Sequence, residues 1–400
     1  MNMKAKKIIT FVLPLLILPI SIMAQNQNDQ FLQTRHYELM AEEGAESCLQ
    51  PLANELELRF DVYNQLFRFN TLPSLLRVRV FLDPKSYNEY VTARMGVSRE
   101  GAVYLHYNQT ERRELVILHG SPEEASMVAH QAFVQFLRGH IRNPPSWMRE
   151  GFAIYFNSLK YDPVTETLKY EENLTWLETL KSLGDKILTP REIMLRDTIV
   201  FSEASASGAV AEIFGRNFQI CSWALVSFLL NSADYFRTMT ESFMMLSPLA
   251  AAAENGMAVA GRFSEWTDIY KMNDDYFAYI DSRRTFAELM DSGRYYYDAG
   301  NAMYAEMAFL SALDLRPKNY APYYYLGLIY YEEAEYEMAE ECYKLSMEYG
   351  ADEALVNYAL GINAASAGRS FDAVDWLEKA AALNPDRYKT RAEDLIQKLR

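Results

Sequence analysis

Five positions recur at intervals of 34 residues in the last third of this 400-residue chain. The recurring residues follow a fixed order: Gly293, Gly327 and Gly361; then Ala305, Ala339 and Ala373; then Phe309, Tyr343 and Leu377; then Ala312, Ser346 and Ala380; and finally Pro317 and Pro385, with Ala351 between them. A period of this length is typical of arrays in which each repeat is a helix pair that must stack on its neighbours to be stable. The spacing therefore predicts three stacked helical repeats.

Each recurring residue type has a physical role in such a helix pair. Glycine and alanine let two antiparallel helices cross closely, because nothing larger than a methyl group fits at the crossing. The aromatic or leucine position fills the gap toward the next repeat. Proline ends the second helix, since its ring cannot continue the hydrogen-bond ladder.

The segment "APYYYLGLIYYEEAEYEMAEECYKLSMEYG" carries nearly the whole pattern, which resembles the tetratricopeptide repeat family. The resemblance covers residues 286–387 and implies an all-α solenoid. Residues 388–400 are expected to form an amphipathic capping helix, with Ala392, Leu395, Ile396 and Leu399 on one side.

The family resemblance also implies a peptide-binding groove lined by the first helix of each repeat. Carried onto this sequence, the groove positions are Met290, Arg294, Tyr297, Asp298, Tyr324, Leu328, Tyr331, Glu332, Leu355, Tyr358 and Ile362. Only one of these residues is a cation, so the expected ligand is a hydrophobic or aromatic segment of a partner protein and not an acidic tail. The alternative is that another part of the same chain fills the groove.

The overall composition limits the other classes of partner. The formal net charge is −15, and clustered basic residues are lacking beyond residue 7, so nucleic acid is not expected as a partner. Half of the residues are apolar, which is typical of a folded protein. The three cysteines, Cys48, Cys221 and Cys342, lie far apart in the sequence and do not suggest a disulfide framework.

Residues 1–24 have the features of a secretory signal peptide. Lys4, Lys6 and Lys7 precede an apolar run from Ile8 to Met23, and a polar segment follows Ala24. Cleavage after Ala24 would give a periplasmic protein. The alternative is an uncleaved segment that tethers the protein to the inner membrane, and no other transmembrane span is expected.

Residues 31–285 are expected to form a separate mixed α/β domain. Helices are predicted over 51–69, 121–141 and 147–159, and strands over 75–83, 101–107 and 114–118, with mostly helical structure from 174 to 284. Pro51 is expected in the first turn of its helix, and Ser121 is expected to cap the helix that follows it.

The segments "MVAHQAFVQFL" and "WMREGFAIYF" give this domain a resemblance to the peptidase MA-like (gluzincin) family. That family carries H-E-x-x-H on one helix and a third zinc ligand, a glutamate, on the next. The second segment keeps the family pattern with Trp147, Glu150, Gly151, Ala153 and Tyr155. In the first segment, His130 matches the first ligand, Gln131 stands at the general-base position and Val134 stands at the second ligand position. The resemblance implies an α+β zincin-like domain followed by the all-α solenoid.

The two departures from the family pattern argue against catalysis. A catalytic zinc needs three protein ligands, and valine cannot ligate. An amide at position 131 cannot accept the proton of a metal-bound water. His130, Gln131 and Glu150 are therefore interpreted as vestigial, with no metal or other cofactor expected and with His130 and Glu150 forming a structural pair. The alternative is a zinc-dependent metallopeptidase with an unusual ligand set, such as His119, His130 and Glu150.

The sequence thus favours an exported protein-binding scaffold that combines a catalytically inactive metallopeptidase-like domain with peptide-binding repeats. A purely structural component of the cell envelope is a further alternative.

Overall fold

The computed structural model describes residues 30–69, 74–171, 174–198 and 215–399. The predicted signal segment and residues 199–214 lie outside this range. The chain divides into two compact units, Met1–Ser282 and Arg283–Arg400. Among the helices of the described residues, none has the length and apolar character needed to cross a membrane.

The first unit is built on a five-stranded sheet with the strand order β1-β2-β3-β5-β4. The strands are β1 (Gln30–Gln33), β2 (Tyr37–Ala41), β3 (Leu76–Phe81), β4 (Ala102–Leu105) and β5 (Glu114–Leu118). Strands β2, β3 and β5 are parallel, while β1 and β4 run antiparallel at the two edges. A separate hairpin pairs β6 (Leu159–Asp162) with β7 (Thr167–Tyr170).

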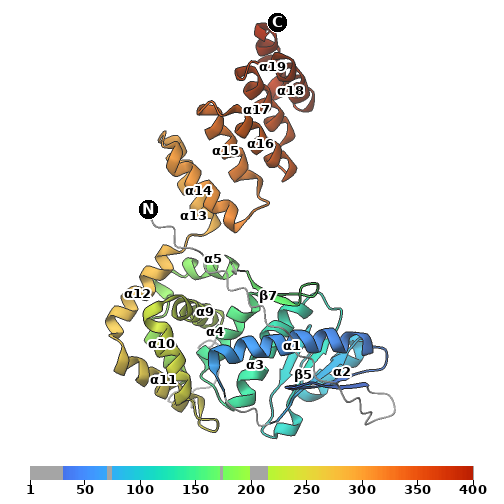
Figure 1. Cartoon of the computed structure of the whole chain (residues 1–400), viewed down its shortest axis with the longest axis vertical. Coiled ribbons are helices and arrows are strands. Elements are labelled where there is room, and N and C mark those ends of the chain that lie inside the picture. Colours follow the sequence, from blue (N-terminus) through green and yellow to red (C-terminus); the bar gives the residue numbers. More distant parts are fainter. Residues whose placement is uncertain (1–29, 70–73, 172–173, 199–214, 400) are drawn as a thin grey trace. The chain divides into compact units, whose positions relative to one another are not determined.

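Helices cover both faces of this sheet. Helices α1 (Glu46–Phe67) and α3 (Glu124–His140) lie across one face, as Figure 1 shows. Alternate residues of β3, such as Val78 and Val80, join the hydrophobic core on that side. On the other face, Tyr87 and Val91 of α2 (Pro84–Met95) pack against Val116 of β5. Burial on both faces explains why β4 and β5 consist almost entirely of buried residues.

The rest of the first unit is helical. Its helices are α4 (Ser146–Asn157), α5 (Leu174–Ser182), α6 (Pro190–Met194), α9 (Arg216–Asn231), α10 (Ala233–Ser242), α11 (Ala252–Trp266) and α12 (Ile269–Ser282). Helices α4 and α9 cross so closely that a Cβ atom at Gly151 would lie 2.4 Å from the carbonyl oxygen of Ser222. This position therefore requires glycine.

Two predicted helix starts are wrong. Helix α1 begins at Glu46, so Pro51 lies inside the helix and not in its first turn. Helix α3 begins at Glu124, and Ser121 does not cap it. The Glu124 carboxylate instead accepts hydrogen bonds from the Gly120 amide and the His119 ring, each at 2.8 Å, and this holds the preceding turn outside the helix.

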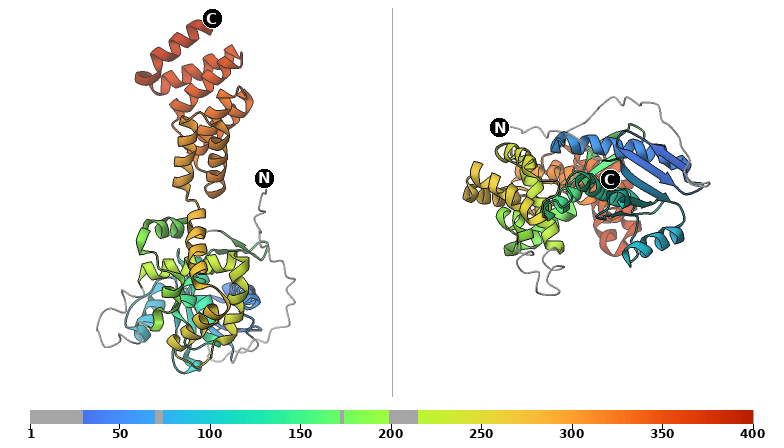
Figure 2. Two further views of the ribbon diagram at one scale, coloured as in Figure 1. Left: turned by 90° about the vertical axis from the view of Figure 1, so that its left-hand side faces the viewer. Right: turned by 90° about the horizontal axis from the view of Figure 1, so that it is seen from below.

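The second unit is a stack of antiparallel helix pairs (Figure 2). The pairs are α13 (Phe286–Asp298) with α14 (Ala302–Leu315), α15 (Tyr320–Glu332) with α16 (Tyr336–Glu348), and α17 (Glu353–Ser366) with α18 (Ser370–Leu383). Equivalent helices keep a period of about 34 residues, so the unit is an all-α helical repeat region that resembles a tetratricopeptide solenoid. Helix α19 (Pro385–Leu399) caps the stack and begins at Pro385, three residues earlier than predicted.

A glycine packed against a large side chain holds each helix pair together. A Cβ atom at Gly293, Gly327 or Gly361 would lie 2.4, 2.5 or 2.7 Å from the side chain of Phe309, Tyr343 or Leu377, respectively. Phe309 also stacks on Tyr325 of the next repeat, with the ring centroids 4.9 Å apart. The same bulky position thus fills the space within its own repeat and contacts the following one.

Substitution of Gly327 by alanine tests this packing. The added methyl group would push against the buried Tyr343 ring, and overpacking of this kind costs about 1–3 kcal/mol. We expect faster hydrogen exchange in peptides from α15 and α16 of the full chain. Gly261→Ala is the control: this helical glycine of α11 has open space around its Cβ position, so exchange in α15 and α16 should not change. Unchanged exchange in Gly327→Ala would contradict the packing role.

Candidate functional site

The predicted groove residues of the repeats lie on α13, α15 and α17, the first helix of each pair. Met290 is only 5% exposed and belongs to the core of the repeats, so it is not part of an accessible surface. Arg294 is exposed and forms an ion pair with Asp291. Two further predicted residues of the groove, Asp298 and Glu332, are exposed. The others are partly exposed: Tyr297, Tyr324, Leu328, Tyr331, Leu355, Tyr358 and Ile362.

Hydrogen bonds between successive repeats fix two of the groove tyrosines. The Tyr297 hydroxyl donates to the Glu332 carboxylate, and the Tyr331 hydroxyl bonds the Ser366 hydroxyl at 3.2 Å. Tyr297 and Tyr331 are equivalent residues one period apart, and so are Glu332 and Ser366. Because the contact repeats, the first helices are held side by side in the same way at both junctions.

Two of the groove tyrosines, Tyr297 and Tyr324, are held in their neutral form. Burial, followed by the Glu332 carboxylate, raises the pKa of Tyr297, and burial raises the pKa of Tyr324. At the end of the array, Tyr358 packs on the buried Tyr388 of α19, with the ring centroids 4.9 Å apart. The resulting surface is aromatic and aliphatic, with uncharged hydroxyl groups.

In the first unit, Glu150 is engaged by neighbouring side chains. Its carboxylate accepts a hydrogen bond from Arg149 at 2.9 Å and another from Gln219 of α9 at 3.0 Å. The structural pairing predicted for His130 and Glu150 is therefore replaced by a link between α4 and α9. Burial lowers the pKa of His130, and this effect outweighs the nearby charge of Glu150. The imidazole is thus neutral near pH 7.

Gln131 and Val134 also have structural roles. The Gln131 side-chain oxygen accepts a hydrogen bond from the Tyr104 backbone amide at 3.2 Å, which ties α3 to the edge strand β4. Val134 packs against the hydrophobic core. Within the described ranges, no three His, Cys, Asp or Glu side chains lie close enough together to hold a metal ion. The residues around His130 therefore do not fit a catalytic zinc centre.

The other histidines of this region do not complete such a centre. His119 is exposed and hydrogen-bonded to Glu124, so the structure does not bring it to His130. His140 is buried, bonds the Phe136 carbonyl and stacks on Phe69. His106 is partly buried, and its Nδ1 atom has no hydrogen-bond partner in the described residues.

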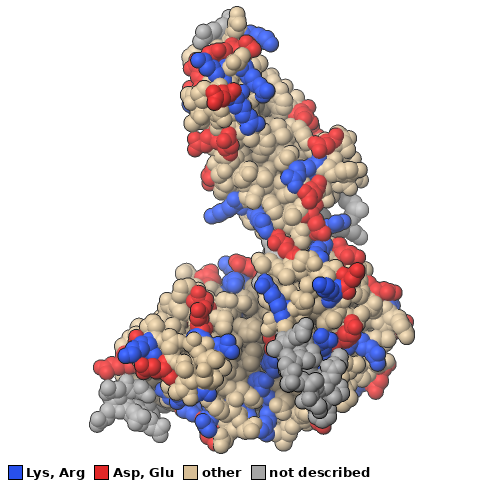
Figure 3. All heavy atoms as spheres, turned by 180° about the vertical axis from the view of Figure 1, so that it is seen from behind, with Lys and Arg blue, Asp and Glu red and all other residues tan. Residues whose placement is uncertain are grey.

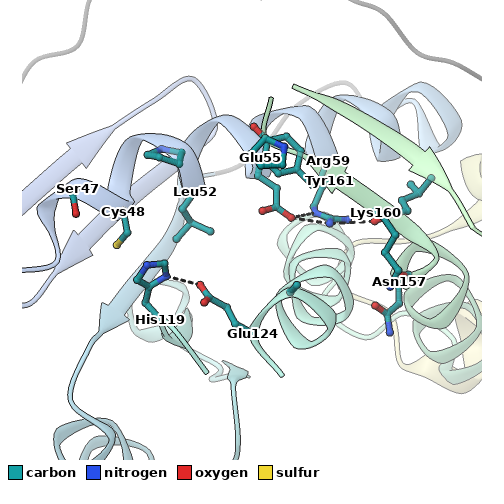
Figure 4. Close-up of a pocket in the computed structure, with 14 residues that line it drawn as sticks. Ser47, Cys48, Leu52, Glu55, Arg59, His119, Glu124, Asn157, Lys160 and Tyr161 are labelled. Carbon is teal, nitrogen blue, oxygen red and sulfur yellow. Dashed lines mark hydrogen bonds and ion pairs between the residues drawn. The ribbon is translucent and has the colours of Figure 1, made fainter. Parts of the chain in front are cut away.

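A cavity of about 490 Å³ lies elsewhere in the first unit, between α1, the start of α3 and β6. Figure 4 shows Cys48 and His119 toward one end and Arg59 toward the other. Arg59 is paired with Glu55 and donates to the Leu159 carbonyl, while His119 is paired with Glu124. Burial raises the pKa of Cys48 to about 11, and its thiol donates to the Ala45 carbonyl. A thiol of this kind is not an activated nucleophile at neutral pH.

No protein-family model matches the chain, and no curated protein matches it. The chain is similar to solved tetratricopeptide structures. One is the first TPR of Spaghetti (RPAP3) bound to an HSP90 peptide, at 17% identity and a TM-score of 0.27, covering 28% of this chain and 89% of that one. Another is the Arabidopsis OM64 TPR domain, at 18% identity and a TM-score of 0.27, covering 28% of this chain and 94% of that one.

A third similar structure is YrrB, described as a TPR protein with an unusual peptide-binding site. The match has 15% identity and a TM-score of 0.27, and it covers 54% of this chain and 94% of that one. TM-scores this low do not support an argument about function. The assignment of the repeats rests on their own helix pairs and period.

Replacing Gln131 by leucine tests its structural role. The Tyr104 amide would lose its acceptor, and an unpaired backbone donor costs about 1–3 kcal/mol where water cannot reach it. We expect a lower free energy of unfolding in urea denaturation. Gln131→Glu keeps a side-chain oxygen at this position and should fall between the leucine variant and the wild type. If the leucine variant has the same free energy of unfolding as the wild type, the hydrogen bond between Gln131 and β4 does not contribute to stability.

Proposed function

We propose that this protein is a binding scaffold whose repeats hold a hydrophobic or aromatic segment of a partner protein. The supporting observation is a set of partly exposed apolar and aromatic side chains on two successive first helices, α15 and α17. Tyr324 and Leu328 on α15 are matched one period later by Tyr358 and Ile362 on α17. Such a repeated surface suits an extended or helical peptide that contacts more than one repeat.

The charges at the groove favour an apolar ligand. Arg294 is the single cation among the predicted groove residues, and its charge is already paired with Asp291. Asp298 and Glu332 add negative charge beside the tyrosines. An acidic peptide would therefore be repelled, whereas an aromatic or aliphatic segment would bury surface against the tyrosine rings.

A double substitution, Tyr324→Ala/Tyr358→Ala, tests the groove. Loss of the two rings removes apolar contact area, and truncation of a buried interface aromatic costs about 2 kcal/mol or more in binding. We expect recovery of a partner in affinity purification from envelope fractions to fall strongly. The matched control is Tyr295→Ala/Tyr320→Ala, which removes two exposed tyrosines of α13 and α15 outside the groove set. Equal recovery with both double variants would overturn the groove assignment.

The proposal for the first unit is a peptidase MA-like fold without a working zinc centre. It is supported by the sequence resemblance and by the contacts of the side chains at positions 131, 134 and 150. Gln131 bonds an edge strand, Val134 packs in the core, and Glu150 is held by Arg149 and Gln219. We further propose, on the pattern of residues 1–24, that the protein is exported.

Restoring the family residues tests this relationship directly. Gln131→Glu/Val134→His would supply the missing carboxylate and an imidazole one helical turn after His130. We expect elemental analysis to find stoichiometric zinc in this variant but not in the wild type. Gln131→Glu/Val134→Ala is the control that lacks the second imidazole. Stoichiometric zinc in the wild type would favour the metallopeptidase alternative, and no zinc in the restored variant would argue against the resemblance.

A further inference from the structure

Three arginines converge on the segment that follows β4. Arg113 donates to the Tyr107 carbonyl at 2.6 Å and to the Asn108 carbonyl at 3.4 Å. Arg142 donates to the Asn108 side chain, and Arg138 donates to the Arg142 carbonyl at 3.2 Å. These residues come from the start of β5 and from the C-terminal end of α3. We call Arg113, Arg138 and Arg142 the arginine cluster.

The arginine cluster has no carboxylate partner. Each of its members is partly buried, and in the part of the chain that the structure describes none forms an ion pair. Glu150, whose charge acts on Arg138, is already bonded to Arg149, and Glu114, which follows Arg113 in the sequence, is paired with Arg79. The C-terminal end of α3 contributes only about half of a negative charge. A surplus of positive charge therefore remains, in a chain whose formal net charge is −15.

The lowered pKa values of neighbouring groups indicate that this surplus of positive charge is unfavourable for the free energy of folding. Burial, followed by the charge of Arg149, lowers the pKa of Arg138 to about 10. Burial, followed by the charges of the arginine cluster and Arg149, lowers the pKa of His106 to about 4. The Nδ1 atom of His106 is buried and has no hydrogen-bond partner in the described residues. The arginine cluster and Arg149 thus lie near the unsatisfied ring nitrogen of His106.

Arg113, Arg138 and Arg142 are each only partly buried, so their guanidinium groups keep some contact with solvent. Figure 3 shows that basic side chains also gather on one face of the first unit. Guanidinium groups present a planar pair of N–H donors that matches the oxygens of a carboxylate or a phosphate. An oxyanion would also supply the negative charge that the arginine cluster lacks.

We propose that the arginine cluster, together with His106, is a binding site for an oxyanion, either a carboxylate or a phosphate group. The site is separate from the repeats and does not depend on the function proposed for them. The arginines would supply the charge and the paired donors, while neutral His106, in the tautomer protonated at Nδ1, would donate that N–H to an oxygen of the anion.

Thermal unfolding of the purified full chain tests the site with citrate, inorganic phosphate and hexaglutamate as probes, each compared with sodium chloride at the same ionic strength. A ligand at about ten times its Kd should raise Tm by about 3 °C or more. Citrate or phosphate would identify a small anion, and an effect of hexaglutamate alone would identify a polypeptide carboxylate. No shift with any of the three would overturn the proposal.

The variant Arg138→Met separates a binding site from a structural cluster. Methionine keeps most of the apolar stem but removes the charge, so the ligand-free protein should melt at or above the wild-type temperature, and the anion-induced shift should disappear. Arg113→Gln provides a second test should the first variant fold poorly. The control is Arg112→Gln, an exposed neighbour that stacks on Tyr107, and it should keep the full shift. An equal shift in the wild type and both cluster variants would mean that the anions bind elsewhere, and the proposal would fail.

Discussion

The contact between a glycine and a bulky side chain within each helix pair determines the geometry of the repeats. The space above Gly293, Gly327 and Gly361 is filled by Phe309, Tyr343 and Leu377, so the two helices of each pair cross at close range. Phe309 also reaches the following repeat, where it stacks on Tyr325, and Leu377 packs with Ala392 and Ile396 of α19. The glycine contact recurs once per period, and hydrogen bonds of Tyr297 and Tyr331 link the first helices of successive repeats.

The first unit uses a comparable close crossing, between α4 and α9 at Gly151. Next to it, Glu150 bonds across the same pair of helices to Gln219. Residues that resemble a zinc centre in sequence thus hold helices and a strand together in the structure. The nearby arginines are different, because no ion pair with a carboxylate of the described residues balances their charges. Unbalanced buried charge is unfavourable for folding, which is why it points to a ligand.

The sequence revealed the repeats because their pattern is local and is repeated three times. It also identified β3, β4, β5 and the helices that carry His130 and Glu150. It did not reveal β1, β2 or the hairpin β6–β7, whose four or five residues mix polar and apolar side chains. The equally short β4 and β5 were recognised because they are nearly continuous apolar runs. Pro51 misled the prediction because proline favours the first turn of a helix, whereas here it lies inside α1, where it removes one hydrogen bond of the helix.

The sequence also could not show which groove residues are accessible, or that the three arginines of the cluster lie close together. Met290 matched a groove position by spacing, but its side chain turns into the core. Arg113, Arg138 and Arg142 are spread over 30 sequence positions, and only the pairing of β5 with β4 and the direction of α3 bring them together. Contacts of this kind depend on tertiary structure, so a periodic pattern in the sequence does not predict them.

The central claim is that the repeats bind an apolar polypeptide segment, and selection from a random displayed-peptide library on the full chain tests it most directly. The account predicts enrichment of peptides rich in aromatic and aliphatic residues, with the enrichment lost when Tyr324 and Tyr358 are both alanine. Enrichment of acidic peptides that survives the double substitution, or no enrichment at all, would contradict it.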